Sequence, residues 1–381
     1  MRHLRGVAVA LVAAVSAAAC DADVVADPSS LLTPTRPAAA LVPLDPFGIG
    51  DHSPGSKGCS AEGYRQFDFW VGKWDVFGFG NTLVGTSVIE SELGGCAIEE
   101  NWTAAFGGGG GKSLNTYDAA TGTWSQLWVG TGGCPFGTAL LEGGFADGSM
   151  TMQGTREQPE GFVSGPPCAP PPNTVVFKRT DYYRWTRLEN GSVLQQIAAA
   201  NDDSPLVLPP PPSTGIGLRY DAVETVTPIN AAPRGSFCTN RAAAKQFDFM
   251  LGSWDVHQGN GDGAQGTATF TKTVTNCLVE EQFAGPGGYA GMSYNTFDVF
   301  TQQWVRTYVD TDGQRLFMTG GLVDGSMVLT GTKHGSAGRS VEVRIAWEPA
   351  GDGQTVAQRW SYSLDGGATW EAEKEVVYTR R

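Results

Sequence analysis

Two stretches of sequence, 180 positions apart, decide the fold. Residues 66–76 read QFDFWVGKWDV, and residues 246–256 read QFDFMLGSWDV. Further matches follow in the same order: CAIEE at 96–100 with CLVEE at 277–281, GKSLNTYD at 111–118 with GMSYNTFD at 291–298, and DGSM at 147–150 with DGSM at 324–327. Self-similarity of this kind indicates that one domain has been duplicated.

The repeat divides the 381 residues into four parts. We expect a signal peptide at 1–19, a disordered, proline-rich tether at 20–58, a first copy at 59–230 and a second copy at 236–381. Arg2 and Arg5 precede an apolar run of about 14 residues, which is too short to span a bilayer. No later segment is apolar for long enough, so we expect no transmembrane helix.

Cys20 can be interpreted in two ways. It follows Ala17-Ala18-Ala19, so either a signal peptidase cuts there and the cysteine is incidental, or Cys20 becomes a lipid-bearing first residue. The seven cysteines favour lipidation, because removing Cys20 leaves six that can pair. We therefore predict an exported protein of the bacterial cell envelope, periplasmic or lipid-anchored, or else secreted.

A duplicated fold should duplicate its disulfides, which are typical of exported proteins. Cys59 and Cys96 correspond to Cys238 and Cys277, so we predict the bridges Cys59–Cys96 and Cys238–Cys277. Cys134 and Cys168 have no counterparts in the second copy and would pair with each other.

Composition and charge exclude one class of partner. Glycine and proline make up 74 of the 381 residues, which favours short strands and turns over helices. The net charge is −13, too acidic for a protein that tracks nucleic-acid phosphates. We expect no nucleic-acid partner, and contact with a membrane only through a lipid on Cys20. The sequence leaves the oligomeric state open.

Each copy consists of short alternating stretches, such as 125–129, 151–154, 193–198, 299–309 and 341–347. They are separated by turn dipeptides typical of hairpins, namely Asp147-Gly148, Asn190-Gly191, Asp312-Gly313 and Asp324-Gly325. No helical period is sustained. An antiparallel sheet of this length must close or form a sandwich to hide its edges, so we predict an all-β protein.

Gly72-Lys73-Trp74 and Gly252-Ser253-Trp254 resemble the Gly-x-Trp signature of lipocalin-like (calycin) barrels. The ordered set of motifs also resembles an uncharacterised family of exported bacterial proteins. The resemblance implies two tandem antiparallel β-barrels, each with a central cavity. It also implies a basic residue over the tryptophan; Arg380 or Arg381 could cover Trp254, but the first copy has no matching arginine.

The CAIEE and CLVEE stretches hold the candidate chemistry. Alternate residues of a strand share a face. Glu100 and Trp102 therefore share a face with Ile98, and the second copy repeats this with Glu281 and Phe283. If the apolar face points into the barrel, one carboxylate of each copy points inward with it.

Glu99 and Glu280 would then point outward to solvent. A buried carboxylate is costly unless it is paired, and its pKa tends to rise. The two inward glutamates are thus candidates for a ligand-orienting group or a general base. The alternative is a structural ion pair with an arginine such as Arg184, Arg344 or Arg359.

Ser113 and Asn115, with Ser293 and Asn295 in the second copy, alternate along the next strand. Facing inward, they would add a small polar site to an apolar cavity, as is usual in small-molecule pockets. The opposite orientation would place Tyr294 inside instead. Both orientations remain open from the sequence.

Trp128 and Tyr308 complete the predicted ligand-binding set. No histidine recurs at matching positions in both copies, which excludes a repeated Ser-His-acid triad. We expect no metal and no cofactor. The leading hypothesis is a protein that binds small apolar or amphipathic molecules in its barrels. The alternatives are an enzyme, a hydrolase or isomerase with Glu100 and Glu281 as acid/base groups, and an envelope structural or interaction protein with filled barrels.

Overall fold

The computed structural model describes residues 58–131, 138–159, 176–202, 217–230, 238–259, 264–334 and 340–381. The predicted signal peptide, nearly all of the tether, Cys20 and the Cys134–Cys168 pair lie outside these residues. Within them, no helix is long and apolar enough to cross a membrane.

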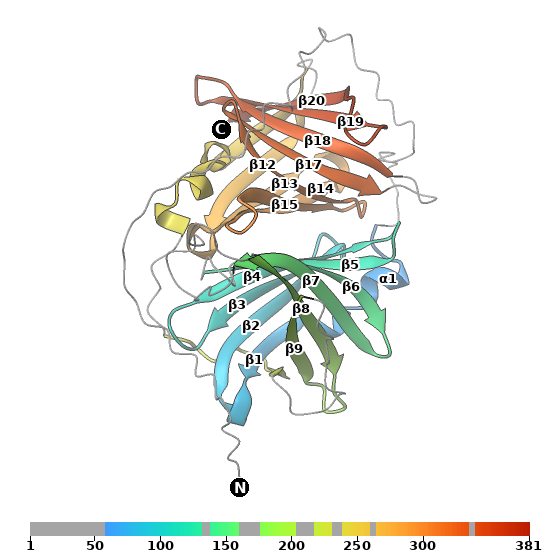
Figure 1. Cartoon of the computed structure of the whole chain (residues 1–381), viewed down its shortest axis with the longest axis vertical. Helices are drawn as coiled ribbons and strands as arrows, with labels where there is room; N and C mark the ends of the chain where they lie inside the picture. The colour runs from blue at the N-terminus through green and yellow to red at the C-terminus, as the bar shows by residue number, and fades with distance from the viewer. Residues whose placement is uncertain are drawn as a thin grey trace.

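Both copies form closed, ten-stranded antiparallel barrels, as predicted (Figure 1). In each barrel every strand pairs with its neighbours in sequence, and the first strand pairs with the last. Closure leaves no exposed sheet edge. The strands of barrel one are β1 (Gly72–Phe77), β2 (Leu83–Glu92), β3 (Ala97–Ala104), β4 (Gly110–Asp118), β5 (Thr123–Gly130), β6 (Thr138–Ala146), β7 (Ser149–Pro159), β8 (Val176–Arg187), β9 (Val193–Asn201) and β10 (Gly217–Ala222).

Barrel two repeats this order. Its strands are β11 (Gly252–Gln258), β12 (Ala264–Thr273), β13 (Leu278–Ala284), β14 (Ala290–Asp298), β15 (Gln303–Asp310), β16 (Arg315–Val323), β17 (Ser326–His334), β18 (Ser340–Pro349), β19 (Thr355–Ser363) and β20 (Glu371–Arg380). The helices are single turns: α1 (Glu62–Arg65), η1 (Asp68–Trp70), η2 (Phe79–Asn81), η3 (Cys238–Asn240), η4 (Ala243–Lys245), η5 (Asp248–Met250), η6 (Val274–Asn276) and η7 (Pro286–Gly288).

The turn chemistry explains two of the hairpins. Asp147 and Gly148 have φ angles of 50° and 73°, and Asp324 and Gly325 have 48° and 85°. Two consecutive positive φ angles match the twist of an antiparallel hairpin, as the dipeptides predicted. One predicted strand, 299–309, begins too early: β15 starts at Gln303, because the preceding residues form a turn capped by the carboxylate of Asp298.

The QFDF motif closes one end of each barrel. In barrel one, the Phe67 ring stacks on Trp70 at 4.9 Å and meets Trp124 and Trp185 edge-on at 5.8 and 5.4 Å. The Trp74 indole nitrogen donates to the Trp70 carbonyl oxygen at 3.0 Å. We call this aromatic end the plugged end, and the opposite end of the barrel the distal end.

Barrel two has the same plug with one addition. The Trp254 indole nitrogen donates to the Met250 carbonyl oxygen at 2.7 Å. The Arg380 guanidinium lies 4.3 Å from the centre of the Trp254 ring and donates to the Leu251 carbonyl oxygen at 2.8 Å. Arg380 is therefore the predicted basic cover of Trp254.

The structure contains both predicted bridges of the duplicated pair, Cys59–Cys96 and Cys238–Cys277. Each ties the segment before the plug to the start of the third strand of its barrel. Disulfides persist in oxidising compartments, so these two indicate an exported chain.

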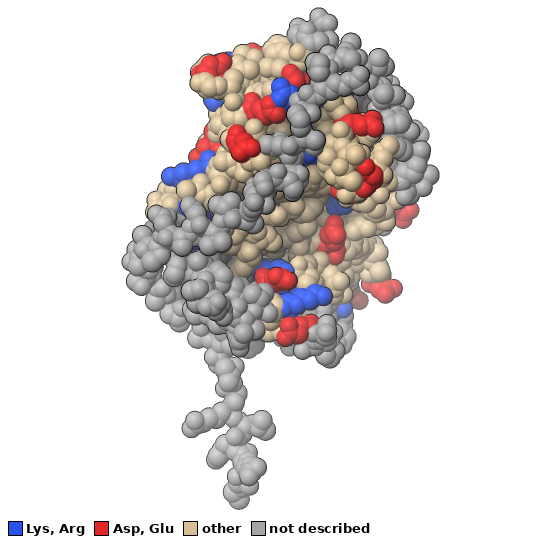
Figure 2. Space-filling model, turned by 45° about the horizontal axis from the view of Figure 1, so that its top comes forward, with Lys and Arg blue, Asp and Glu red and all other residues tan. Residues whose placement is uncertain are grey.

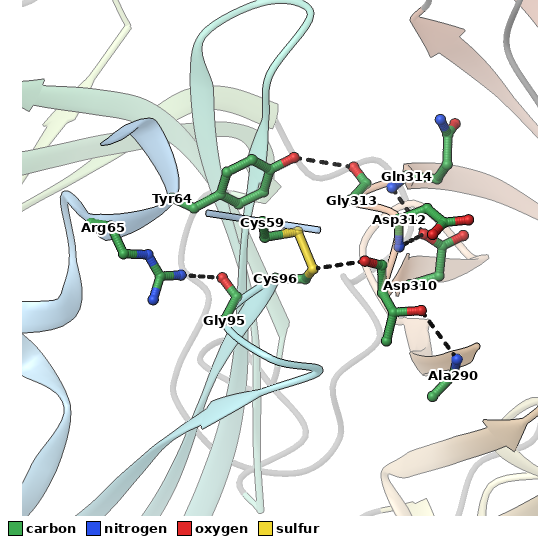
Figure 3. The surroundings of a disulfide bond; sticks show 11 residues. Cys59, Tyr64, Arg65, Gly95, Cys96, Ala290, Asp310, Asp312, Gly313 and Gln314 are labelled. Carbon is green, nitrogen blue, oxygen red and sulfur yellow. Dashed lines mark hydrogen bonds between the residues drawn. A yellow bond between two sulfur atoms is a disulfide. The ribbon is translucent and has the colours of Figure 1, made fainter. Parts of the chain in front are cut away.

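The two barrels lie side by side with their plugged ends pointing in opposite directions (Figure 1). At the plugged end of barrel one, the Tyr64 hydroxyl donates to the Gly313 carbonyl oxygen at 3.4 Å, and Cys96 Sγ lies 3.5 Å from the Thr311 carbonyl oxygen (Figure 3). The Cys96 sulfur is in a disulfide and carries no hydrogen, so the second contact is van der Waals packing. The turn at 311–314 belongs to the distal end of barrel two.

Candidate functional site

β3 and β13 point one glutamate of each copy into its barrel. Glu100 and Glu281 are 4% and 3% exposed, and their carboxylates contact residues of the neighbouring inner faces. The predicted inward orientation of these two side chains is therefore what the structure shows. Their surroundings differ between the copies, and that difference defines the site.

In barrel one, Glu100 accepts hydrogen bonds from hydroxyl groups. Ser87 donates to Oε1 at 2.9 Å and Ser113 donates to Oε2 at 3.1 Å. Behind Ser113, the Asn115 amide donates to the Ser113 hydroxyl at 3.1 Å, and the Gln126 amide donates to Asn115 Oδ1 at 2.8 Å. Ser113 and Asn115 thus face inward, which decides between the two orientations that the sequence left open.

Glu100 has no cationic partner among the described residues. Burial raises its pKa from 4.5 to about 7, although hydrogen bonds from Ser87, Ser113 and Tyr220 favour the charged form. The carboxyl group therefore changes its protonation state near neutral pH. Buried carboxyls of this kind are found at ligand-orienting and acid/base positions.

In barrel two, an arginine neutralises the equivalent carboxylate. Arg306 Nη2 donates to Glu281 Oε2 at 2.7 Å, and both side chains are 3% exposed. Arg306 Nη1 donates to the Ser293 hydroxyl at 2.6 Å and to Asn295 Oδ1 at 2.8 Å. Ser293 in turn donates to Glu281 Oε2 at 2.8 Å, so these four side chains form one connected network.

The alternative of a structural ion pair with an arginine is confirmed for Glu281, but the partner is Arg306 and none of the three named arginines. Arg184 bonds Gln196, Arg344 lies over the Trp370 ring, and Arg359 pairs with surface glutamates. Each lies at a position whose side chain alternates to the outer face of its strand. Arg306 could have been found by extending the internal alignment, because Trp124 matches Trp304 and Gln126 therefore matches Arg306.

The aromatic members of the predicted set lie on the same inner faces, toward the distal ends. Trp102 and Trp128 are half-buried beside Ser87 and Ser113 in the strand register. A Cβ atom added at Gly111 would lie 2.4 Å from the Trp128 ring, so the glycine of the Gly-x-Ser motif makes room for that ring.

The second copy keeps this arrangement. Phe283 and Tyr308 are half-buried on the inner faces of β13 and β15. A Cβ atom at Gly291 would lie 2.5 Å from the Tyr308 hydroxyl oxygen. The predicted ligand-binding residues of each copy are therefore brought together on one inner surface.

Glu99 and Glu280 do not reach solvent, contrary to the prediction. They point out of their barrels but are only 8% and 7% exposed, because the other barrel covers them. Lys112 Nζ lies 3.1 Å from Glu99 Oε1 and 2.9 Å from Glu280 Oε2. The Tyr294 hydroxyl donates to Glu99 Oε1 at 2.6 Å. Alternation separates inner from outer faces, but it does not show what covers an outer face.

We call this contact between the barrels the seam. Burial alone would lower the pKa of Lys112, but Glu280 and Glu99 outweigh it and the pKa is raised. Apolar side chains of β4 and β5, Leu114, Leu127 and Val129, continue into one core with Met292 and Val309 of barrel two. The two barrels are therefore packed as one body.

Two open cavities are found among the described residues. One, of about 530 Å³, is lined by Thr155, Arg156, Glu157, Phe177, Lys178 and Asp202, and the other, of about 270 Å³, by Glu142 and residues of β16 and β17. Neither contains a predicted site residue. On the face shown in Figure 2, acidic and basic side chains of the described residues are interspersed.

No protein-family model matches the sequence, and no curated protein matches it. Among solved structures, the chain is similar to a protein of unknown function from the DUF3598 family of Nostoc punctiforme, at 10% identity and a TM-score of 0.17. That likeness covers 84% of this chain and 100% of the other. A TM-score of this size carries no argument, so the barrel fold rests on the strand pairing described above.

Proposed function

We propose that the protein is exported and that barrel one binds a small amphipathic molecule, with an organic ammonium group as its polar end. The observation that carries this proposal is the Glu100 carboxyl, which is buried and hydrogen-bonded to hydroxyls without a cation among the described residues. A bound ammonium would supply the charge that Arg306 supplies in barrel two.

The surroundings of Glu100 support this ligand class. Trp102 and Trp128 lie on the same inner surface, and aromatic rings attract organic cations through their faces. The rings would also contact the apolar part of the ligand. A carboxylate with aromatic walls therefore favours an amine over a fatty acid, whose carboxylate would repel Glu100.

Titration calorimetry of the exported chain with n-octylamine and with octanoate tests the proposal. We expect octylamine to bind, and Glu100→Gln to weaken it at least tenfold, while Glu90→Gln, at an exposed position, leaves it unchanged. Affinity should rise with pH from 5.5 to 8, because Glu100 must ionise to pair with the ammonium. Equal binding of octanoate, or of octylamine by Glu100→Gln, would contradict the proposal.

Enzymatic use of the same carboxyl is the second candidate. A pKa of about 7 suits a general acid/base at neutral pH, and this observation favours it. The two candidates separate in the Glu100→Gln variant: a catalyst loses turnover and the inflection near pH 7 in its rate profile, even where ligand affinity survives.

We further propose that Cys20 carries a lipid. The support is the Ala17-Ala18-Ala19-Cys20 sequence together with the disulfides, which indicate export. Metabolic labelling of the producing cells with radioactive palmitate should mark the wild-type protein and not Cys20→Ser. Equal labelling of both, or of neither, would contradict lipidation.

A further inference from the structure

Two buried hydrogen-bond donors inside barrel two have no partner among the described residues. They are Arg306 Nε and the indole nitrogen of Trp347. The Arg306 guanidinium carbon lies 5.2 Å from the centre of the Trp347 ring, so the two side chains pack against each other. Arg306 is 3% exposed and Trp347 is fully buried. A buried donor left without an acceptor costs about 1–3 kcal/mol, so this part of the interior is incomplete by itself.

Acceptor atoms of three neighbouring side chains are already engaged. Glu281 accepts from Ser293 and Arg306, and Asn295 Oδ1 accepts from Arg306. The Tyr378 hydroxyl is hydrogen-bonded with Gln358. The interior therefore has donors in excess, and what completes it is an acceptor.

The charges of the site favour a neutral acceptor. Arg306 is compensated by Glu281 at 2.7 Å, so the pair has no net charge. A carboxylate placed beside it would bring a second negative charge next to Glu281 in a buried site, which is costly. A carbonyl oxygen of an amide, ketone or ester would satisfy the two donors without that cost.

The residues on the distal side suit an apolar body. Tyr308 lies on the distal side of Arg306. The centre of its ring is 5.4 Å from the guanidinium carbon of Arg306. Phe283 meets Tyr289 edge-on at 5.9 Å, and the Tyr289 hydroxyl donates to Asp310 Oδ2 at 2.8 Å. Aromatic walls with one polar anchoring point are typical of small-molecule sites.

We propose that barrel two binds a small neutral molecule whose carbonyl oxygen accepts hydrogen bonds from Arg306 Nε and Trp347 Nε1. This inference rests on the proposed function, that the barrel interiors bind small molecules. It adds that the two copies have diverged in the chemistry they recognise. The indole nitrogen of Trp185, the counterpart of Trp347, also has no partner among the described residues of barrel one, but Gln126 stands there in place of Arg306, so the second donor is particular to barrel two.

The probe is N,N-dimethyloctanamide, which has a carbonyl acceptor and no N–H donor. It is titrated into the full exported chain labelled with ¹⁵N-tryptophan, and the indole N–H signals are followed by NMR. We expect the Trp347 signal, assigned from Trp347→Phe, to move downfield, and Trp347→Phe to weaken binding about tenfold. Arg306→Gln, which installs the residue of barrel one, should weaken binding at least as much. Trp185→Phe, the matched change in barrel one, should leave it unchanged.

Other outcomes overturn the inference. Unchanged amide affinity in Trp347→Phe would show that the indole is no donor to the ligand, and tighter binding of octanoate than of the amide would show that the site selects charge. A crystal structure in the presence of the amide that shows only an ordered water on both donors would do the same. Octylamine binding to barrel one without amide binding overturns this inference alone, whereas no binding of either probe overturns the proposed function as well.

Discussion

Replacing Glu100 by glutamine should stabilise the protein at high pH. The folded state holds this carboxyl with a pKa of about 7, against 4.5 for an unperturbed glutamate. Between these two pH values the folded state binds more protons than the unfolded state. The free energy of unfolding therefore falls as pH rises through this window, and the cost is complete above about pH 7.

The size of the effect follows from the two pKa values. The difference between 4.5 and about 7 corresponds to about 3 kcal/mol of stability lost between pH 4.5 and pH 8. Glutamine does not titrate, and its amide can exchange hydrogen bonds with the Ser87 and Ser113 hydroxyls. The buried tyrosines nearby, Tyr220 and Tyr183, have pKa values raised by burial and stay neutral throughout this range.

The same substitution in barrel two should have the opposite effect. Glu281→Gln leaves Arg306 buried without its counter-charge, and breaking a buried ion pair costs about 3–5 kcal/mol. The same Glu→Gln substitution, made at equivalent positions of the two barrels, thus stabilises one barrel and destabilises the other at pH 8. The sign of the stability change depends on the residue at one position of each barrel. That residue is the neutral Gln126 in barrel one and the cation Arg306 in barrel two.

Guanidinium chloride unfolding, followed by tryptophan fluorescence at pH 4.5, 6 and 8, measures both variants. The stability of Glu100→Gln relative to wild type should rise with pH across this series, and Glu281→Gln should be the less stable variant at pH 8. If Glu100→Gln tracks the wild type at a constant difference, the carboxyl does not titrate between 4.5 and 7 in the folded state. Glu100 then carries no uncompensated charge in the folded protein at pH 8.

Three further changes test other parts of the molecule. Lys112→Met, which installs the residue found at the matching position of copy two, should destabilise by about 3 kcal/mol or more in chemical unfolding, because two seam carboxylates lose their cation; a neutral effect would mean the seam needs no charge. Cys96→Ser and Cys277→Ser should each lower the free energy of unfolding by about 4 kcal/mol, because the disulfides close loops of 37 and 39 residues in the unfolded chain. A double variant whose loss differs from the sum of the two would show that the bridges do not act separately. Arg380→Ala should cost about 2 kcal/mol by loss of its packing on Trp254, read from the same unfolding curves, with wild-type stability as the refuting result.

Local sequence rules were sufficient for the barrels. The duplicated motifs indicate two folding units. Each QFDF motif builds one plug, and the strand that comes directly after it pairs with the last strand of its copy and closes that barrel. Period-two alternation placed Glu100 and Glu281 inside correctly, and residue correspondence between the copies identified the two described disulfides. Each of these depends on neighbours in the chain or on equivalence between copies.

The seam and the partner of Glu281 depend on contacts between distant segments. Nothing adjacent to Glu99 in sequence indicates that Lys112 and a second barrel will cover it. Arg306 lies 25 positions after Glu281, and its role appears only when β13, β14 and β15 lie side by side. The copies also differ at this position, with Gln126 in the first and Arg306 in the second. Comparing the two sequences shows this difference but does not show that Arg306 pairs with Glu281.

In one cluster of the seam a single lysine pairs with two glutamates, one from each barrel, while Arg315 pairs separately with Asp118 across the same contact. Two separate, identical subunits around a twofold axis must contribute every residue in pairs, so they could place two such lysines there or none. In this chain position 112 is lysine and its counterpart, position 292, is methionine. Fusion of the copies removed that constraint of symmetry, and a single cation now serves both carboxylates with no second ammonium group to remove from water.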